Sequence, residues 1–363
     1  MKISKIPGLG RFGLFIDDVD FDHITDEEWM EIGRLHLNSL VTIIRNTNAT
    51  LEQYNHRISQ FGQQRGSFGH QLTDKYKKSL REIWDMFKNN DPALDKDSRD
   101  VLTCMHNSFL NVGSLHKVED GFDENGLPRG AFPEGELGWH SNEPGHLTFV
   151  PGVALYGQRG MINSATGFCT TVDWYESQSN SFRSELDDMI IEHHFRPDRY
   201  LQGMTNEMSL KWIGSNAVPL KGVGKVPLVI DSPGGIRGLH YSLATVDTIE
   251  GMNQLESQRI FDIIDQGIFQ EKYTYHHWYQ QDNDMLLFDN SITAHRRIGK
   301  NENRMAVRVQ FDYDNLQKGF YQPYQLHGRI ARKYIQEVTQ QIANGTTLGI
   351  RAPSVVDYLR TFL

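Results

Sequence analysis

The chain has 363 residues, 38% of them hydrophobic and 11% aromatic, which is enough to bury one large core or two smaller ones. Its net charge of −9 is spread without a basic stripe, so nucleic acid and an anionic membrane are not expected as partners. Only Cys104 and Cys169 are present, which excludes a disulfide framework and favours a reducing compartment. With no signal-peptide core and no apolar run of roughly 18 residues, we expect a cytoplasmic protein.

The first hundred residues predict a helix, a strand and then a largely helical segment. Thr25 and Glu28 form a capping-box pattern before residues that are apolar at helical spacing. The β-branched run at 40–44 is typical of a buried strand. Residues 51–100 are polar and helical in pattern.

A long loop is predicted from Val112 to Gly138, where eight Gly or Pro residues stand among many charges. Loops of this length in a compact domain are mobile lids or disordered, and this one leads directly to His140, so we interpret 112–138 as a lid. Met105, His106 and Asn107 shortly precede the loop and follow an apparent strand start at Val101 and Leu102. We therefore consider these three residues candidates for lining the substrate pocket.

The middle of the chain alternates short strand-like runs with turns. Such runs occur at 147–156, 167–174, 227–230 and 272–278. Two helices are predicted at 252–266, ended by Gly267, and at 330–343, ended by Asn344 and Gly345. Many short strands without regularly alternating helices indicate a mainly β sandwich or barrel decorated by helices. We expect one domain over 1–363.

The first candidate metal site is the run Trp139-His140-Ser141-Asn142-Glu143. Side chains alternate faces along a strand, so His140 and Asn142 would point the same way. A His-x-acid pair with a distant His is the facial triad that binds Fe(II). Because the chain has 15 His residues, a lone His-x-Asn pair is far more often structural than metal-binding.

A second segment supplies the distant histidine. Residues 285–288 read as a buried strand that turns at Asp289 and Asn290, and His295 follows at the mouth of that strand. This position would allow His295 to lie close to His140. Two other histidine pairs, His276-His277 and His193-His194, are interpreted as structural, the second as a polar helix end.

Residues 304–311 alternate strictly, with Arg304, Ala306, Arg308 and Gln310 on one face. Two guanidinium groups on an inward face require anions, and arginine offers a bidentate fork for a carboxylate. On an outward face they would simply be solvated, an equal alternative for an isolated strand. Their closeness to His295 in sequence favours the inward orientation.

These segments resemble the taurine dioxygenase family of Fe(II)/2-oxoglutarate-dependent oxygenases, whose fold is a double-stranded β-helix, or jelly roll. The resemblance rests on the Trp-His-x-Asp-like start at Trp139, the Asp-Asn-x-x-x-x-His run from Asp289 to His295, and the Arg-x-x-x-Arg pair at Arg304 and Arg308. A weaker match is the Gly-containing run at 166–170, which ends in Thr170, and residues 10–46 resemble the first strand-helix-strand unit of the family. The likeness covers most of the chain.

The resemblance implies roles for six residues. His140 and His295 would bind iron, with Asn142 at the position of the acidic ligand. Arg304 and Thr170 would hold the distal carboxylate of 2-oxoglutarate, and Arg308 would face the co-substrate or the substrate. The implied reaction consumes 2-oxoglutarate and O₂, releases succinate and CO₂, and hydroxylates an unactivated C–H bond of a small, anionic or zwitterionic molecule. A homo-oligomer is compatible with the resemblance.

The departure from the family pattern is Asn142. The amide oxygen could bind iron weakly, or Glu143 could replace it if the backbone bulges. Alternatively, chloride could fill the position, as in related halogenases, although these carry a smaller residue there. A third class of function, a non-catalytic protein that binds a small carboxylate, is also compatible with loss of the acidic ligand.

Overall fold

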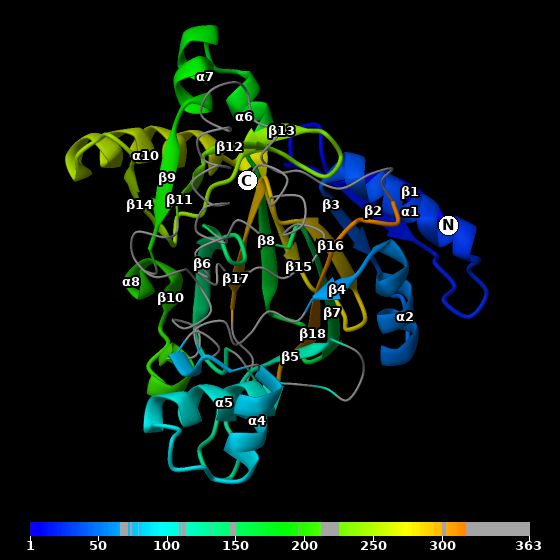
Figure 1. Ribbon diagram of the computed structural model, residues 1–363. Coiled ribbons are helices and arrows are strands. Elements are labelled where there is room, and N and C mark those ends of the chain that lie inside the picture. The colour runs from blue at the N-terminus through cyan, green and yellow to red at the C-terminus, as the bar shows by residue number, and fades with distance from the viewer. Residues whose placement is uncertain are drawn as a thin grey trace.

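The computed structural model describes residues 1–65, 72, 75–78, 80–108, 110, 114–130, 132–145, 150–194, 196–211, 225–299 and 303–316. Figure 1 shows two sheets at the centre, with helices at the sides and at one end. The helices are α1 (Asp26–Ser39), α2 (Leu51–Phe61), α4 (Leu80–Lys88), α5 (Lys96–Ser108), α6 (Val172–Glu176), α7 (Asn180–Asp187), α8 (Pro197–Tyr200), α10 (Gln254–Ile268) and the 3-10 turn η1 (Glu271–Tyr273).

The larger sheet joins the N-terminal strands to strands from the second half of the chain. All its neighbouring pairs are antiparallel except β2 and β3, which helix α1 connects in parallel. In spatial order the strands are β1 (Lys2–Lys5), β2 (Leu14–Asp17), β3 (Val41–Ile44), β16 (Met285–Asp289), β7 (Gly152–Arg159), β18 (Met305–Phe311) and β4 (Gln64–Arg65), and β5 (His116–Glu119) also pairs with β18.

The smaller sheet is antiparallel throughout and faces the larger one. Its order is β10 (Leu201–Gln202), β6 (Glu136–His140), β17 (Thr293–Ile298), β8 (Ala165–Thr170) and β15 (Thr274–Trp278). An outer layer contains β11 (Lys225–Pro227), β9 (Ile190–His193) and β14 (Val246–Ile249), and also the hairpin of β12 (Val229–Asp231) and β13 (Arg237–Leu239).

The side-chain alternation of the strands divides the core into layers. In β18, Val307 and Val309 pack with α1 and α2 on the outer face of the larger sheet. Ala306 packs instead with Phe168 of β8 and Phe288 of β16, so its face lies between the two sheets. Arg304, Arg308 and Gln310 share the phase of Ala306, as the sequence predicts. Two packed sheets with helices outside them confirm the predicted jelly-roll core.

The N-terminal helix begins where the sequence predicts. The Thr25 side chain accepts a hydrogen bond from the backbone N–H of Glu28, and the Glu28 carboxylate accepts one from the backbone N–H of Thr25. Trp29 and Ile32 then lie buried against the larger sheet. The predicted strand at 40–44 is β3, and all four of its residues are buried.

Several sequence predictions need correction. Strand β5 lies inside the predicted loop 112–138, and α5 continues through Val101 and Leu102, where a strand start was expected. Helix α10 continues through Gly267, which was expected to end it. A Cβ at this position would lie 1.9 Å from the indole Nε1 of Trp174, so the glycine allows the helix to pack closely against that ring. The predicted helix at 330–343 lies outside the described residues.

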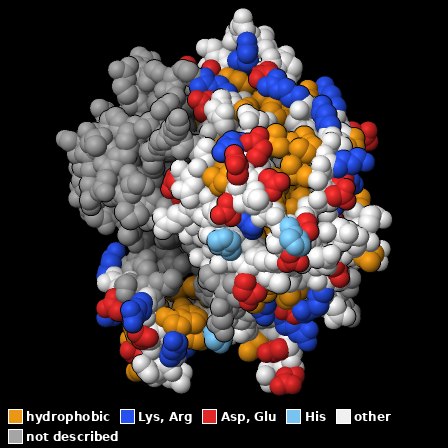
Figure 2. All heavy atoms as spheres, turned by 90° about the vertical axis from the view of Figure 1, so that its right-hand side faces the viewer, with side chains coloured by type: hydrophobic (Ala, Val, Ile, Leu, Met, Phe, Trp, Pro, Cys, Tyr) orange, Lys and Arg blue, Asp and Glu red, His pale blue; other side chains and the backbone are white. Residues whose placement is uncertain are grey.

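The face on the right-hand side of Figure 1 carries interspersed acidic and basic side chains around an apolar area (Figure 2). Exposed pairs such as Arg34 with Glu31 form along the helices, and each contributes little to stability. Among the helices of the described residues, none has both the length and the apolar character needed to cross a membrane.

Candidate functional site

His140 and His295 lie directly opposite each other on neighbouring strands. His140 is the last residue of β6, and the antiparallel register pairs it with His295 of β17. Their ring centroids are 4.1 Å apart, and the Phe288 ring lies 4.7 Å from that of His295 on the other side. Two segments that are 155 positions apart in the sequence therefore bring both imidazoles into the space between the sheets, as the sequence predicts.

Both imidazoles are in the neutral form that binds metal ions. Burial lowers the pKa of His140 to about 4, although the carbonyl of Gly138 opposes the shift. Burial lowers the pKa of His295 well below its usual value, and the charges of His140 and Arg308 add to the effect. His140 Nδ1 donates to the Gly138 carbonyl over 2.7 Å, which leaves Nε2 as the nitrogen that could hold a metal ion.

Asn142 lies beyond the end of β6, so the predicted strand alternation does not place it beside His140. Asn290 positions it instead. The backbone N–H of Asn142 donates to Asn290 Oδ1 over 2.7 Å, and Asn290 Nδ2 donates to the carbonyls of Asn142 and Val150. The sequence analysis noted Asn290 only as a turn residue, since nothing local shows that its amide bonds a backbone 148 positions away.

The side-chain oxygen of Asn142 is turned toward Arg308. Arg308 Nη1 donates to Asn142 Oδ1 over 3.3 Å. Asn142 is 7% exposed, and its Nδ2 atom has no hydrogen-bond acceptor in the described part of the chain. This amide therefore presents a donor, not a ligand oxygen, to the rest of its surroundings.

Glu143 is buried and has a left-handed backbone with φ of 54°, a conformation that L residues rarely adopt. The chain thus does bend after β6, which was the condition set for Glu143 to act as a ligand. However, no three His, Cys, Asp or Glu side chains within the described ranges are arranged to hold a metal ion. Glu143 does not complete the His140–His295 pair in this arrangement.

Arg308 faces the two histidines from the opposite sheet. Its charge contributes to the lowered pKa of both His140 and His295. In β18 it pairs with His116 of β5, a buried residue whose pKa falls to about 3 because of burial and, secondarily, the Arg308 charge. Sequence reasoning gave His116 no role because it lay inside the predicted loop.

Arg304 is 1% exposed and directly precedes β18, and its side chain reaches the residue before β8. Its Nε donates to Ser164 Oγ over 3.2 Å, and its Nη1 lies 3.7 Å from Asp120 Oδ1 without a hydrogen bond. Asp120 also pairs with the buried Arg297 over 3.0 Å. Two buried arginines thus share one carboxylate, and the excess positive charge favours binding of an anion beside Arg304.

Thr170 does not lie with Arg304. It pairs with Thr293 at the far end of β8, whereas Arg304 contacts Ser164 before the strand begins. Thr166 is nearer. Its hydroxyl lies 2.9 Å from the hydroxyl of Tyr279, whose pKa burial raises to about 12 against the opposing charge of Arg304. Thr170 lies four positions along the strand from Thr166, roughly 13 Å away, so Thr166 replaces Thr170 as the candidate neighbour of Arg304.

The two remaining histidine pairs make buried polar contacts that suit the expected structural role. His193 is the last residue of strand β9, so the predicted helix end at this position is wrong. Its Nδ1 atom lies 2.9 Å from Thr245 Oγ1. His277, in β15, forms a buried pair with Asp284 over 2.9 Å.

The sequence profile described as "Taurine catabolism dioxygenase TauD, TfdA family" matches residues 3–310, which include both histidines and both arginines. The chain belongs to the TauD/TfdA family. No curated protein matches it in sequence.

Solved structures share the fold of this TauD/TfdA member. A taurine dioxygenase from Burkholderia xenovorans, described as putative and alpha-ketoglutarate-dependent, is 18% identical, with a TM-score of 0.56 over 85% of this chain and 92% of that one. AAD-2 in complex with Mn(II) and N-oxalylglycine is 15% identical, with a TM-score of 0.56 over 86% and 97%. A putative 2,4-D dioxygenase from Burkholderia xenovorans is 14% identical, with a TM-score of 0.53 over 85% and 96%.

Membership of the TauD/TfdA family makes the chain an Fe(II)/2-oxoglutarate-dependent dioxygenase, as the resemblance predicts. The residues of the site fit both Fe(II) and 2-oxoglutarate. The buried, neutral histidine pair suits a divalent metal, and the Arg304 Nη1 atom without a hydrogen bond suits a carboxylate. At the position of the family's acidic ligand, this chain carries Asn142.

Proposed function

We propose that the chain hydroxylates an unactivated C–H bond of a small anionic or zwitterionic substrate, with His140 and His295 as its iron ligands. The observation that carries the proposal is the cross-strand pairing of these two neutral, buried imidazoles. When bound, iron supplies the oxidative decarboxylation of 2-oxoglutarate to succinate and CO₂ and the oxidation of the substrate.

Arg304 is proposed to bind the distal carboxylate of 2-oxoglutarate. Its guanidinium is held in place by Ser164 and Asp120 and retains one donor nitrogen without a hydrogen bond. Thr166, near Arg304, is a better candidate than Thr170 for a second contact. A carboxylate here would compensate the buried positive charge that Asp120 shares between two arginines.

Arg308 is proposed to orient the substrate through an anionic group. It faces the histidines from β18, and it donates hydrogen bonds to the neutral amides of Asn142 and Gln310. Phe168 and Phe288, packed beside His295, exclude water from the same space.

Closure over the site is proposed only for part of the predicted lid. Of 112–138, β5 is held in the larger sheet, and Arg297 donates hydrogen bonds to the carbonyls of Phe132, Glu134 and Gly135. In the described part of the chain, residues 121–130 have no such bonds to the sheets, and the Asn107 side chain of α5 contacts them at the Pro128 carbonyl. We therefore limit the lid proposal to them.

The decisive experiment is anaerobic loading with Fe(II), followed by measurement of bound iron and of succinate formed from 2-oxoglutarate with and without candidate substrates. We expect about one iron per chain and succinate that increases with a true substrate. His140→Ala and His295→Ala should abolish both, whereas His56→Ala, at an exposed position, should change neither. Absence of iron and succinate in the wild-type protein would leave a carboxylate-binding protein as the remaining explanation.

Halogenation is the second candidate because the Asn142 Nδ2 donor, which is buried and has no acceptor among the described residues, suits a chloride ion beside the histidines. In that case the halide would take the place of the missing carboxylate. Product analysis by mass spectrometry, with chloride and then bromide as the only halide, distinguishes the two outcomes. Hydroxylated product in both salts rejects halogenation, and a product mass that follows the halide rejects simple hydroxylation.

A further inference from the structure

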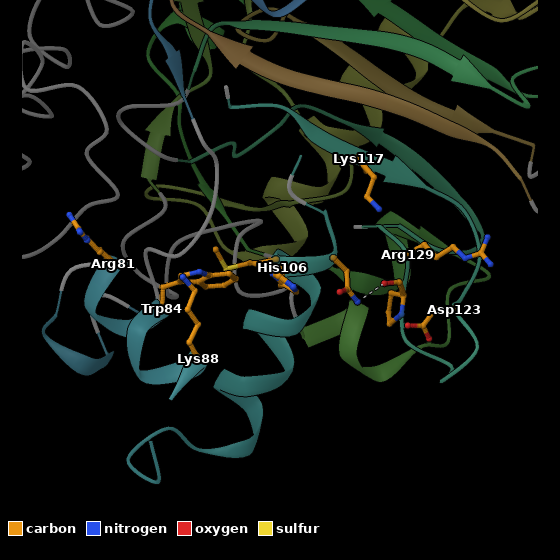
Figure 3. Close-up of a pocket in the computed structure, with 10 residues that line it drawn as sticks. Arg81, Trp84, Lys88, His106, Lys117, Asp123 and Arg129 are labelled. Atoms are coloured by element: carbon orange, nitrogen blue, oxygen red, sulfur yellow. Dashed lines mark hydrogen bonds between the residues drawn. The ribbon is translucent and has the colours of Figure 1, made fainter. Parts of the chain in front are cut away.

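A cavity of about 870 Å³ is lined by residues other than the His140–His295 pair. Figure 3 shows it between helices α4 and α5, strand β5 and the turn that contains Asp123. His116 and Lys117 are consecutive in β5, so their side chains lie on opposite faces. His116 pairs with Arg308 in the larger sheet, and Lys117 lines the cavity.

Four cationic side chains from three different elements line this cavity. Arg81 and Lys88 come from α4, Lys117 from β5 and Arg129 from the turn region (Figure 3). This concentration of positive charge contrasts with the net charge of −9 of the whole chain. Four positive charges around one cavity favour an anionic ligand.

Few carboxylates offset these charges. Asp123 is the one acidic residue of the lining, and its Oδ1 already accepts the backbone N–H groups of Asn125 and Leu127. Lys117 pairs with Glu119 over 3.2 Å. Within the described ranges, Arg81, Lys88 and Arg129 form no ion pair, so their charges remain available to a ligand.

One wall of the cavity is aromatic. The ring of Trp84 on α4 lies 5.7 Å from that of His106 on α5, and Figure 3 shows the two side by side. The turn opposite contacts α5 through one hydrogen bond, which Asn107 Nδ2 donates to the Pro128 carbonyl over 3.0 Å. Met105, His106 and Asn107, expected to line the substrate pocket, line this separate cavity.

We propose that this cavity binds an organic phosphate with two or more phosphate groups and a planar ring, of the nucleoside diphosphate class. Arginine forks and lysine charges on three elements suit an extended polyanion better than a single carboxylate. The Trp84 ring provides a face on which a base can stack. A volume of about 870 Å³ is in the range of small-molecule sites.

The test is binding of ADP, pyrophosphate and adenosine to the full chain by isothermal titration calorimetry at low and moderate salt. We expect ADP and pyrophosphate to bind, ADP more tightly, with affinity that falls as salt rises. Adenosine should bind weakly or not at all. Lys88→Gln and Arg129→Gln should each weaken ADP binding about tenfold, because each removes a charged hydrogen-bond donor.

Matched variants separate this site from the histidine site. Arg259→Gln removes an exposed charge elsewhere and should leave ADP affinity unchanged. Trp84→Ala should weaken binding of ADP but not of pyrophosphate. The proposal is overturned if ADP and pyrophosphate fail to bind at about 10 mM, if Arg259→Gln weakens binding as much as Arg129→Gln, or if His140→Ala or saturating 2-oxoglutarate abolishes it.

Discussion

The Asn142 amide oxygen accepts a hydrogen bond from Arg308, and its Nδ2 atom lies buried without an acceptor in the described part of the chain. A neutral amide so oriented has little tendency to bind a metal ion, because its oxygen is already engaged by a cation. At the scale of single residues, a neutral amide therefore stands where the family pattern has a carboxylate, beside the proposed iron ligands.

Asn142→Asp should raise metal affinity at least about tenfold, because a carboxylate near two neutral imidazoles adds Coulomb attraction for a divalent ion. Mn(II) binding by titration calorimetry measures the change without turnover. Asn142→Ala serves as the control and should not raise the affinity. Equal affinity of Asn142→Asp and the wild-type protein would show that position 142 does not face the metal.

Arg304→Lys keeps the charge but loses the fork that would bind a carboxylate through two nitrogens. We expect the KM for 2-oxoglutarate to rise about tenfold or more, with Mn(II) affinity unchanged, since Arg304 contacts Ser164 and Asp120 and not the histidines. Succinate formation at varied 2-oxoglutarate measures the KM. A loss of metal binding together with an unchanged KM would contradict the assignment.

Among the secondary-structure elements, β6, β17 and the segment that follows β6 determine the site. The β6–β17 register places the two histidines opposite each other, and Asn290, just before β17, bonds both backbone groups of Asn142. Arg297 of β17 also holds the C-terminal part of the predicted lid, because it donates hydrogen bonds to the backbone carbonyls of Glu134 and Gly135.

Asn290→Ala should lower the free energy of unfolding by about 2–4 kcal/mol, because three buried hydrogen-bonding groups lose their partner. Denaturant unfolding followed by circular dichroism measures the loss. Asn38→Ala, on the exposed side of α1, removes one amide hydrogen bond at the surface and should change the stability by less than about 0.5 kcal/mol. A similar small loss for both variants would mean that Asn290 does not hold the segment after β6.

At the scale of the whole molecule, buried neutral histidines link stability to pH. Burial lowers the pKa of His36 to about 3 and that of His240 to about 4, and it lowers that of His193 well below the usual value. The unfolded chain binds protons at these groups below about pH 6.5, where the folded chain does not. These histidines therefore leave the free energy of unfolding at its full value above this pH and lower it as the pH drops toward 4.

Two carboxyl groups act in the opposite sense. Burial raises the pKa of Asp265 and of Asp289 to about 6, so between pH 4 and 6 the folded chain holds protons that the unfolded chain has lost. Because the buried histidines outnumber them, we expect the free energy of unfolding to decrease from pH 7 to pH 4.5. His36→Gln should reduce the slope by up to about 1.4 kcal/mol per pH unit, and His56→Gln should not. Urea unfolding at several pH values measures both slopes.

Local patterns in the sequence were sufficient for several features. The capping box at Thr25, the alternation of residues 304–311 and the family motifs at His140 and His295 each depend on neighbours within a few positions. Hydrogen bonding and side-chain phase at that range follow directly from residue order.

The tertiary structure decided the features that depend on register between distant segments. These are the position of Asn142 beyond the end of β6, the contact of Asn290 with it, and the choice of Thr166 instead of Thr170 beside Arg304. Strand ends and pairing registers arise from the packing of the whole sheet, and no local pattern specifies them. The sequence by itself thus determined the family and the histidine pair, whereas only the folded sheet determined what surrounds that pair.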